Sequence, residues 1–201
     1  MKLSDYKIFF AAVGLTGILL IASPVLGVIV HFPRGEMFSE LYILGPGRMA
    51  ENFPFNIAVG EVYHVYVGAR NHMGQSAYYV IYVKFGSNLD PLPNVTSGTP
   101  SPLPPLFEYR FLLSDEATFE RKLNFSITNA DFIDNQSIVN TIEINGVKFN
   151  VDKSRVWDTE PQGFYYRLIM ELWIFNDVTG QMEFANRFVY LHLNVTRNTS
   201  R

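Results

Sequence analysis

The chain has 201 residues, no cysteine and a formal net charge of -3 at pH 7. Without cysteine it can have no disulfide framework, no cysteine-ligated zinc site and no thiol nucleophile. The slightly acidic balance, with a pI near 5.8, lacks the basic footprint of a nucleic-acid-binding protein, so we expect no nucleic-acid partner.

The first distinctive stretch is an uncharged, apolar run from Ile8 to Val30. About 20 predominantly apolar residues are enough to cross a bilayer as a helix. We therefore predict that residues 1–32 form a cytoplasmic stub and a transmembrane anchor, with residues 8–30 in contact with membrane lipid. A cleaved signal peptide is the alternative, but its apolar core is usually about 7–15 residues long and ends at a small-residue cleavage site. No clean site of that kind lies near Ser23 or Gly27.

The charges on either side of this run predict its orientation. Lys2 and Lys7 precede it, whereas Arg34 follows it with Glu36 close by. An excess of lysine before a span favours a cytoplasmic N-terminus. We therefore expect a single-pass protein of the cell membrane, with residues 33–201 forming an extracellular domain that is long enough for a core of its own.

Short apolar and β-branched runs separated by turn residues follow the anchor, and this pattern predicts strands. A proline-rich stretch over residues 88–105 interrupts them, and proline cannot donate to a strand ladder. We expect a surface loop there; a polyproline segment that binds a partner, or a division into two subdomains, are the alternatives. The predicted strands before the loop are Phe38–Leu44, Ile57–Val67 with a bend at Gly60, and a central strand Ser76–Phe85, with a turn region from Gly68 to Gly74.

The runs after the loop pair naturally with their neighbours in sequence. Asn145-Gly146 is the dipeptide favoured by a two-residue type I′ turn. Together the runs predict a mainly β fold, an antiparallel immunoglobulin-like β-sandwich on one N-terminal transmembrane helix. The expected hairpins are Leu106–Leu113 with Thr118–Thr128, Ile138–Ile144 with Val147–Val151, and Tyr165–Phe175 with Glu183–Val195.

Five N-x-S/T sequons occur in the part of the chain that we place outside the membrane. Such sequons accept N-linked glycans when they lie on the surface of a secreted domain. Short polar residues also favour turns, which is the alternative reason for their abundance. The predicted glycosylation sites are Asn94, Asn124, Asn135, Asn194 and Asn198.

Several blocks of the sequence resemble an uncharacterised family of archaeal membrane proteins, domain of unknown function 1616. The blocks are FSELYILGPGRMAENFPFNIAVGE, VGARNH, PPLFEYRFLLSDEATFERKLNFSI and YYRLIMELWIFNDVTGQMEFANRFVYLHLNVT. The resemblance implies an archaeal cell-surface domain with an immunoglobulin-like strand pattern. The family has no agreed catalytic residues, so the resemblance assigns none to this chain.

Few residues suggest chemistry. His64 and His72 could meet across a turn and hold a metal ion, but they lack compact ligand spacing. Asp115-Glu116 and the pair Asp158 and Glu160 could act as paired carboxylates, although acidic residues are common in turns. No nucleophile elbow, phosphate loop or dinucleotide fingerprint occurs. We therefore expect no enzyme activity and no cofactor.

The last predicted hairpin carries aromatic residues on both of its faces. One face suits a core, and the opposite face also keeps aromatic side chains beside Arg167. Exposed aromatic residues with arginine are typical of protein interfaces, although the proline-rich loop could instead cover them. The predicted partner-interface residues are Tyr165, Trp173, Phe175, Phe188 and Tyr190.

These features favour a glycosylated surface protein with a structural or protein-binding role, as an accessory subunit of an archaeal membrane or envelope assembly. Its expected partners are other membrane or envelope subunits or a second copy of itself. One alternative is a carbohydrate-binding module in which Trp157 and Trp173 are stacking platforms. A second alternative is a metal-binding or hydrolytic ectodomain that uses His64 and His72.

Overall fold

The structure is a computed structural model that describes residues 6–7, 9–18 and 36–197. The chain divides into two compact units, Met1–Met37 and Phe38–Arg201. In the first unit, residues 6–7 and 9–18 are helical. A search of the described residues finds no helix that combines the length and the apolar character needed to cross a membrane. The remainder of the predicted anchor, residue 8 and residues 19–30, lies outside the described residues.

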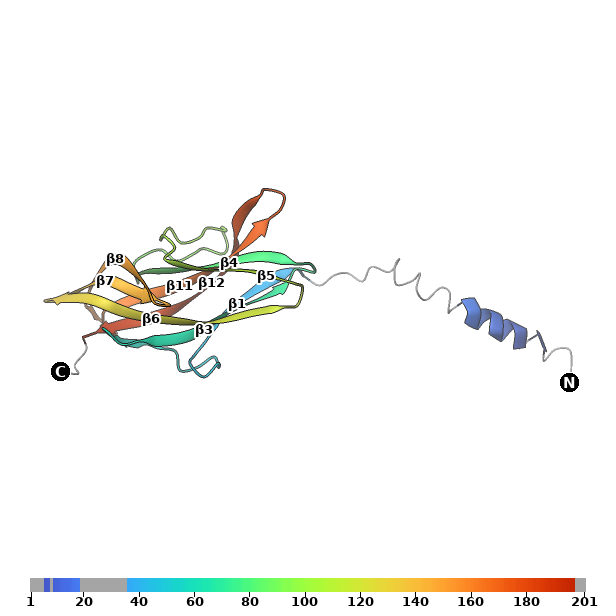
Figure 1. The fold of residues 1–201 in the computed structure, drawn as a ribbon, viewed down its shortest axis with the longest axis horizontal. Coiled ribbons are helices and arrows are strands. Elements are labelled where there is room, and N and C mark those ends of the chain that lie inside the picture. The colour runs from blue at the N-terminus through green and yellow to red at the C-terminus, as the bar shows by residue number, and fades with distance from the viewer. Residues whose placement is uncertain (1–5, 8, 19–35, 198–201) are drawn as a thin grey trace. The chain divides into compact units, whose positions relative to one another are not determined.

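The second unit is a β-sandwich of two five-stranded sheets (Figure 1). The first sheet has the order β1-β3-β6-β7-β8, and the second has the order β2-β12-β11-β4-β5. The mainly β sandwich predicted from the sequence is thus confirmed. The strands are β1 Phe38–Leu44, β2 Asn56–Ala58, β3 Tyr63–His72, β4 Ala77–Ser87, β5 Phe107–Leu113, β6 Thr118–Ile133, β7 Gln136–Ile144, β8 Val147–Val156, β9 Asp158–Thr159, β10 Gln162–Gly163, β11 Tyr165–Asn176 and β12 Gln181–Thr196.

Residue alternation along the strands builds the core between the two sheets. In β11 the predicted core residues Tyr166, Leu168 and Met170 are completely buried, and in β6 Leu123 and Ile127 face them from the first sheet. Burying a side chain of this size contributes about 1.5–3 kcal/mol. The period of two therefore identified the inward faces of these strands correctly.

The β7–β8 hairpin turns where the sequence predicts. Asn145 and Gly146 have φ values of 49° and 84°, as a type I′ turn requires, and Ile144 pairs with Val147. The Asn145 side chain donates to the hydroxyl of Tyr109 at 2.8 Å, which ties this turn to β5 of the opposite sheet.

The prediction of one strand over Ile57–Val67 is wrong. β2 and β3 lie in opposite sheets, and the chain crosses between them at Gly60, which has a φ of 90°. The N–H of Gly60 donates to the carbonyl of Ile127 at 2.8 Å, which holds the crossing against β6. Local alternation cannot distinguish a bend within one strand from a change of sheet.

The predicted turn region from Gly68 to Gly74 is also wrong in its first part, because β3 continues to His72 and pairs with β1 along its length. Gly68 pairs with Tyr42 of β1, and the ring of Tyr42 covers this glycine. A Cβ atom at Gly68 would overlap the ring of Tyr42. A glycine within a strand here marks close packing rather than a turn.

β5 and β6 do not form the predicted hairpin. β5 pairs with β4, and β6 pairs with β3 and β7, so residues 114–117 carry the chain from one sheet to the other. Strands on both sides of the proline-rich loop contribute to both sheets. The loop is therefore not a boundary between subdomains, and Phe38–Arg201 form one unit.

Candidate interaction site

The proline-rich loop covers the outer face of the second sheet over β4 and β11. Beneath it, Lys84 Nζ lies 2.8 Å from Glu171 Oε2, and both side chains are almost completely buried. The carbonyl of Ser101 in the loop accepts from Lys84, and the N–H of Ser101 donates to Glu171 Oε1 at 2.9 Å. Trp173 Nε1 donates to the other Glu171 oxygen at 3.1 Å. The buried ion pair thus has hydrogen-bond partners from the loop and fastens it to the sheet.

A glycine in β4 allows this close contact. A Cβ atom at Gly86 would lie 2.6 Å from Leu103 Cδ1 and 2.8 Å from Asp90 Oδ2, both in the loop. Leu103 is buried, and the carboxylate of Asp90 accepts from the N–H of Ser87 at 2.7 Å. The loop therefore packs directly against the outer face of the sheet at β4.

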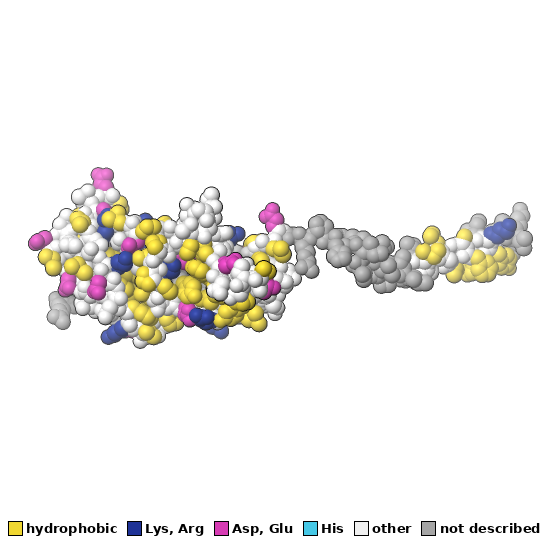
Figure 2. Space-filling model, turned by 90° about the horizontal axis from the view of Figure 1, so that it is seen from above, with side chains coloured by type: hydrophobic (Ala, Val, Ile, Leu, Met, Phe, Trp, Pro, Cys, Tyr) yellow, Lys and Arg dark blue, Asp and Glu magenta, His cyan; other side chains and the backbone are white. Residues whose placement is uncertain are grey.

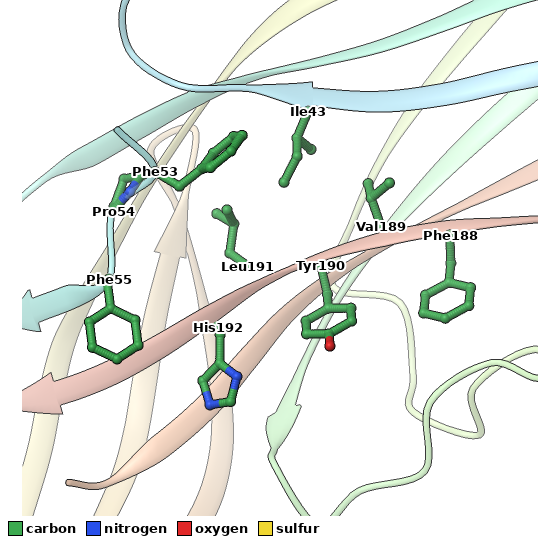
Figure 3. A pocket seen from close by; sticks show the side chains of 9 residues that line it. All are labelled: Ile43, Phe53, Pro54, Phe55, Phe188, Val189, Tyr190, Leu191 and His192. Carbon is green, nitrogen blue, oxygen red and sulfur yellow. The ribbon is translucent and has the colours of Figure 1, made fainter. Parts of the chain in front are cut away.

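Along β12 the sheet is not covered in this way, and a cavity of about 530 Å3 opens beside the strand. Figure 3 shows its lining on two sides of β12, with Ile43, Phe53, Val189 and Leu191 on one side and four ring-bearing side chains on the other. We call this cavity the β12 groove. Its complete lining is Ile43, Phe53, Pro54, Phe55, Phe188, Val189, Tyr190, Leu191 and His192.

The ring-bearing side of the groove is a band of rings along β12. The rings of Phe188 and Tyr190 are nearly parallel with centroids 6.4 Å apart, and His192 lies 5.1 Å from the ring of Tyr165. Arg167 places its guanidinium 5.6 Å from the ring of Tyr190. Burial lowers the pKa of His192, and the charge of Arg167 lowers it further, so the imidazole is neutral at neutral pH.

Hydrophobic side chains also reach the surface elsewhere on this unit, in clusters as well as singly (Figure 2). Single exposed apolar residues are normal, whereas a contiguous patch marks a surface that interacts with something. The β12 groove is such a patch, because Phe53, Phe55 and Tyr190 are 38%, 44% and 39% exposed and line one cavity.

The five aromatic residues predicted as one interface do not lie together. Phe188 and Tyr190 line the groove, but Tyr165 is only 3% exposed, which corrects its predicted place on an exposed face. Trp173 packs against Tyr82 and donates to Glu171, as described above. Phe175 lies near the end of the β11–β12 hairpin, which projects beyond the sheet (Figure 1).

Sequence reasoning missed the groove residues that come from outside the last hairpin. Phe53 and Phe55 belong to the segment before β2, which reaches the groove because β2 pairs with the end of β12 in parallel. Ile43 comes from β1 of the other sheet. Only the cluster of aromatic residues in ENFPF marked this segment, and nothing local shows which strand it meets.

A second cavity of about 430 Å3 contains Trp157. Trp157 packs edge to face on Phe164 at 4.9 Å, and Arg197 lies over the ring of Phe132 at 5.3 Å. Asp134, Asn135 and Thr196 supply polar groups to the same lining. Trp157 thus lines a mixed aromatic and polar cavity, whereas Trp173 packs against Tyr82 and Phe184.

The histidines predicted as a metal pair cannot share an ion. His64 and His72 both lie in β3, and at about 3.3 Å per residue they are roughly 26 Å apart. His72 instead bridges two carboxylates, with Nδ1 2.8 Å from Glu116 and Nε2 3.1 Å from Glu40. The Glu116 hydrogen bond raises the pKa of His72. Within the described parts of the chain, no group of three or more His, Asp or Glu side chains is arranged so that it could hold a metal ion.

Three of the four candidate carboxylates have partners of other kinds, and the fourth, Glu160, is exposed. Asp115 accepts from the N–H of Gly74 at 2.8 Å, and Glu116 pairs with His72 and Arg70. The guanidinium of Arg155, 2.6 Å from Asp158, lowers the pKa of that carboxyl. These arrangements are ion pairs and turn contacts, not two carboxylates that face a common substrate.

The sequons differ in their surroundings. Asn94 and Asn135 are exposed, whereas Asn124 and Asn194 are half-buried. The Asn194 amide accepts from the N–H of Phe164 at 3.1 Å and donates to Asn56 at 3.0 Å, so it already has structural partners. Asn198 lies outside the described residues.

Residues 33–136 match the sequence profile of a family described as Domain of unknown function (DUF1616). The chain belongs to this family. The matched region of this DUF1616 member includes Phe53 and Phe55, and it ends before β12. No curated protein matches the sequence.

Solved structures similar to this DUF1616 protein have low sequence identity. A CARDB domain from Pyrococcus furiosus, solved in complex with di-metal ions, is 10% identical, with 82% of this chain and 91% of that chain covered and a TM-score of 0.38. A chain of the complex between zinc 2-glycoprotein and prolactin inducible protein from human seminal plasma is 8% identical, with 82% of this chain and 99% of that chain covered and a TM-score of 0.37. A β-glucosidase from Listeria innocua is 10% identical with a TM-score of 0.38, and the match covers 79% of this chain but only 16% of that enzyme.

Proposed function

We propose that this chain is a membrane-anchored extracellular protein whose immunoglobulin-like sandwich binds another protein, as an accessory subunit of an archaeal membrane or envelope assembly. The role is structural and non-catalytic. The observation that carries the proposal is the β12 groove, in which apolar and aromatic side chains from three separate segments line one exposed cavity. Aromatic residues beside an arginine are the composition that protein interfaces favour.

The location outside the membrane rests on the sequence. The uncharged run Ile8–Val30 supports an anchor, and the lysines before it support a cytoplasmic N-terminus. The sequons support a surface glycoprotein, and Asn94 and Asn135 are accessible on the folded unit. We place the sandwich outside the cell on these grounds.

Co-purification tests the binding role. We expect Phe188→Ser and Tyr190→Ser to reduce recovery of a stoichiometric partner from native membranes in mild detergent, because each removes part of the band that lines the groove. Phe175→Ser is the matched control, since Phe175 is 44% exposed but lies outside the groove. Unchanged recovery with both folded groove variants would contradict the proposal.

The absence of cysteine allows a direct test of location. Val178 is 91% exposed, so Val178→Cys introduces one accessible thiol. A membrane-impermeant maleimide should label this variant on intact cells. Labelling only after the cells are opened would place the sandwich on the cytoplasmic side and refute the anchored arrangement.

Carbohydrate binding is a second candidate, favoured by the cavity at Trp157. An indole beside carboxylate, amide and guanidinium groups offers a stacking surface and hydrogen bonds for a sugar ring. An array of envelope glycans should bind the protein, and Trp157→Ala should abolish that binding while Trp173→Ala leaves it unchanged. Equal effects of the two substitutions on glycan binding would show that Trp157 is not the stacking platform.

A further inference from the structure

The edge of β12 has backbone groups without partners. The N–H of Asn194 donates to Phe55 and not to β11, so Asn194 directs its backbone groups away from β11. The β11–β12 register is continuous from Asn194 to Phe188, and backbone direction alternates along a strand. The N–H and C=O groups of Phe188, Tyr190 and His192 therefore also point away from β11. In the described part of the chain, no second strand pairs with these three residues, and no other backbone hydrogen bond reaches them.

This open edge is short and closed at both ends. At one end β2 pairs in parallel with Asn194–Thr196, and the chain before β2 leaves the edge at Pro54, which has no N–H to donate. At the other end the register shifts at Leu172 and Asn186 has a φ of 54°. Arg187 there donates from Nε to the carbonyl of Ser39 in β1 at 3.1 Å. Between these ends, Phe188–His192 form a slot for one short strand.

We infer that an extended segment of another polypeptide fills this slot by adding a strand to the edge of β12. This inference rests on the proposed protein-binding function and names the kind of partner. Main-chain groups of the segment pair with Phe188, Tyr190 and His192. Its side chains alternate between the two sides of the groove, with apolar residues opposite Val189 and Leu191 contacting Ile43 and Phe53.

The dimensions of the slot favour a short segment over a second copy of this chain. An antiparallel β12–β12 pair would bring the β2 of each copy towards the bulge of the other, where Arg187 is already bonded to β1. The cavity lining contains no Asp, Glu, Lys or Arg, and the pKa of its one histidine, His192, is lowered. The segment is therefore uncharged where it contacts the groove, since a buried unpaired charge would be costly.

A peptide library tests the inference on the full-length chain in detergent. The probe is a set of synthetic heptapeptides with Val, Ile or Phe at alternate positions and Thr, Gln or Tyr between them. Amide resonances of Phe188, Tyr190 and His192 should shift, while the protection of Val189 and Leu191 from hydrogen exchange stays unchanged. Absence of binding by every peptide, or shifts centred elsewhere, would overturn the inference.

Tyr190→Pro separates main-chain pairing from side-chain contact. It removes an outward N–H that has no partner in the isolated chain, and edge strands tolerate proline. We expect about tenfold weaker peptide binding than for Tyr190→Thr, which keeps the N–H but also lacks the ring. A peptide N-methylated on its bonding edge should lose binding, and one methylated on the opposite edge should retain it. Equal affinity of the two variants would overturn the inference.

The two proposals fail in different ways. If Phe188→Ser abolishes partner recovery from membranes but Tyr190→Pro and Tyr190→Thr recover the partner equally, the groove binds a protein through side chains and strand addition is wrong. If every variant recovers the partner like the unaltered chain, the proposed function itself is wrong.

Discussion

The two halves of the outer face of the second sheet differ in their side chains and in what covers them. Over β4 and β11, the proline-rich loop packs on Gly86 and places Ser101 between the buried Lys84 and Glu171. Along β12, the rings of Phe188 and Tyr190 line an open groove. The proline-rich loop covers the first half, whereas the second half has exposed rings and backbone groups without hydrogen-bond partners.

The side chains of each half indicate what kind of segment can pack on it. Buried charges must be paired and hydrogen-bonded, so a loop that covers them has to supply polar groups at fixed positions. Ser101 does so for Lys84 and Glu171. The β12 groove has apolar walls and a strand edge instead, and its complement must be an apolar, extended backbone. Substitutions should therefore affect stability in the covered half and binding in the open half.

The largest effect should come from breaking the buried ion pair. Glu171→Ala leaves Lys84 buried without its partner, and we expect the free energy of unfolding to fall by about 3–5 kcal/mol. Tyr190→Ser in the open half should cost no more than about 1 kcal/mol. Urea denaturation measures both values. The double variant Lys84→Met with Glu171→Leu removes both charges but leaves the Ser101 N–H and carbonyl without partners, so it should recover only part of the loss. A double variant less stable than Glu171→Ala would contradict an unpaired Lys84 charge as the main source of the loss.

A smaller effect should follow from lifting the loop. Gly86→Ala forces Leu103 and Asp90 to move, and overpacking of this kind costs about 1–3 kcal/mol. Gly47→Ala is the matched control, because its Cβ would meet only Met49 Cε at 3.7 Å. Thermal unfolding compares them. Equal melting temperatures for the two variants would mean that the loop does not depend on close contact at Gly86.

The pH dependence of stability should distinguish His192, in the aromatic band, from His72, which is bonded to Glu40 and Glu116. His192 has its pKa lowered from 6.5, so its contribution is complete above this value and declines as the pH falls towards the folded pKa. His72 has its pKa raised from 6.5, so its contribution is complete below this value and is lost as the pH rises through the folded pKa. His192→Gln should flatten the acidic side of the melting-temperature profile, and His72→Gln should flatten the alkaline side. If both variants changed the melting-temperature profile on the same side, the opposite pKa shifts of the two histidines would be refuted.

The smallest effect on stability should come from the sequons. On protein from the native host, mass spectrometry should find glycans at Asn94 and Asn135, which are exposed. Asn194 should be unmodified, because a glycan on its amide would displace the hydrogen bond to Asn56. Asn94→Gln and Asn135→Gln should then change the melting temperature little. Full occupancy of Asn194 would contradict its structural role.

Much of the strand content was predictable, because it depends on local alternation and turn chemistry. β1 has the predicted bounds, and the Asn145-Gly146 turn lies where the dipeptide predicts it. The inward face of β11 was identified by its period of two. The partners of strands were less predictable: Gly60 and residues 114–117 look like local turns but carry the chain between sheets.

The candidate site was predictable only in part, for the same reason. Phe188 and Tyr190 were found because alternation places them on the outer face of one strand. The separation of Tyr165 and Trp173 from them depends on burial and on a loop distant in sequence.

The sequence by itself determined which residues form strands, which faces are apolar and where one hairpin turns, because these follow from neighbouring side chains. The tertiary structure decided which sheet each strand joins, which half of the outer face is covered, and that Phe53 and Phe55 meet β12. These outcomes depend on contacts between distant segments, whose free energy is gained only when the chain has folded and which no local pattern encodes.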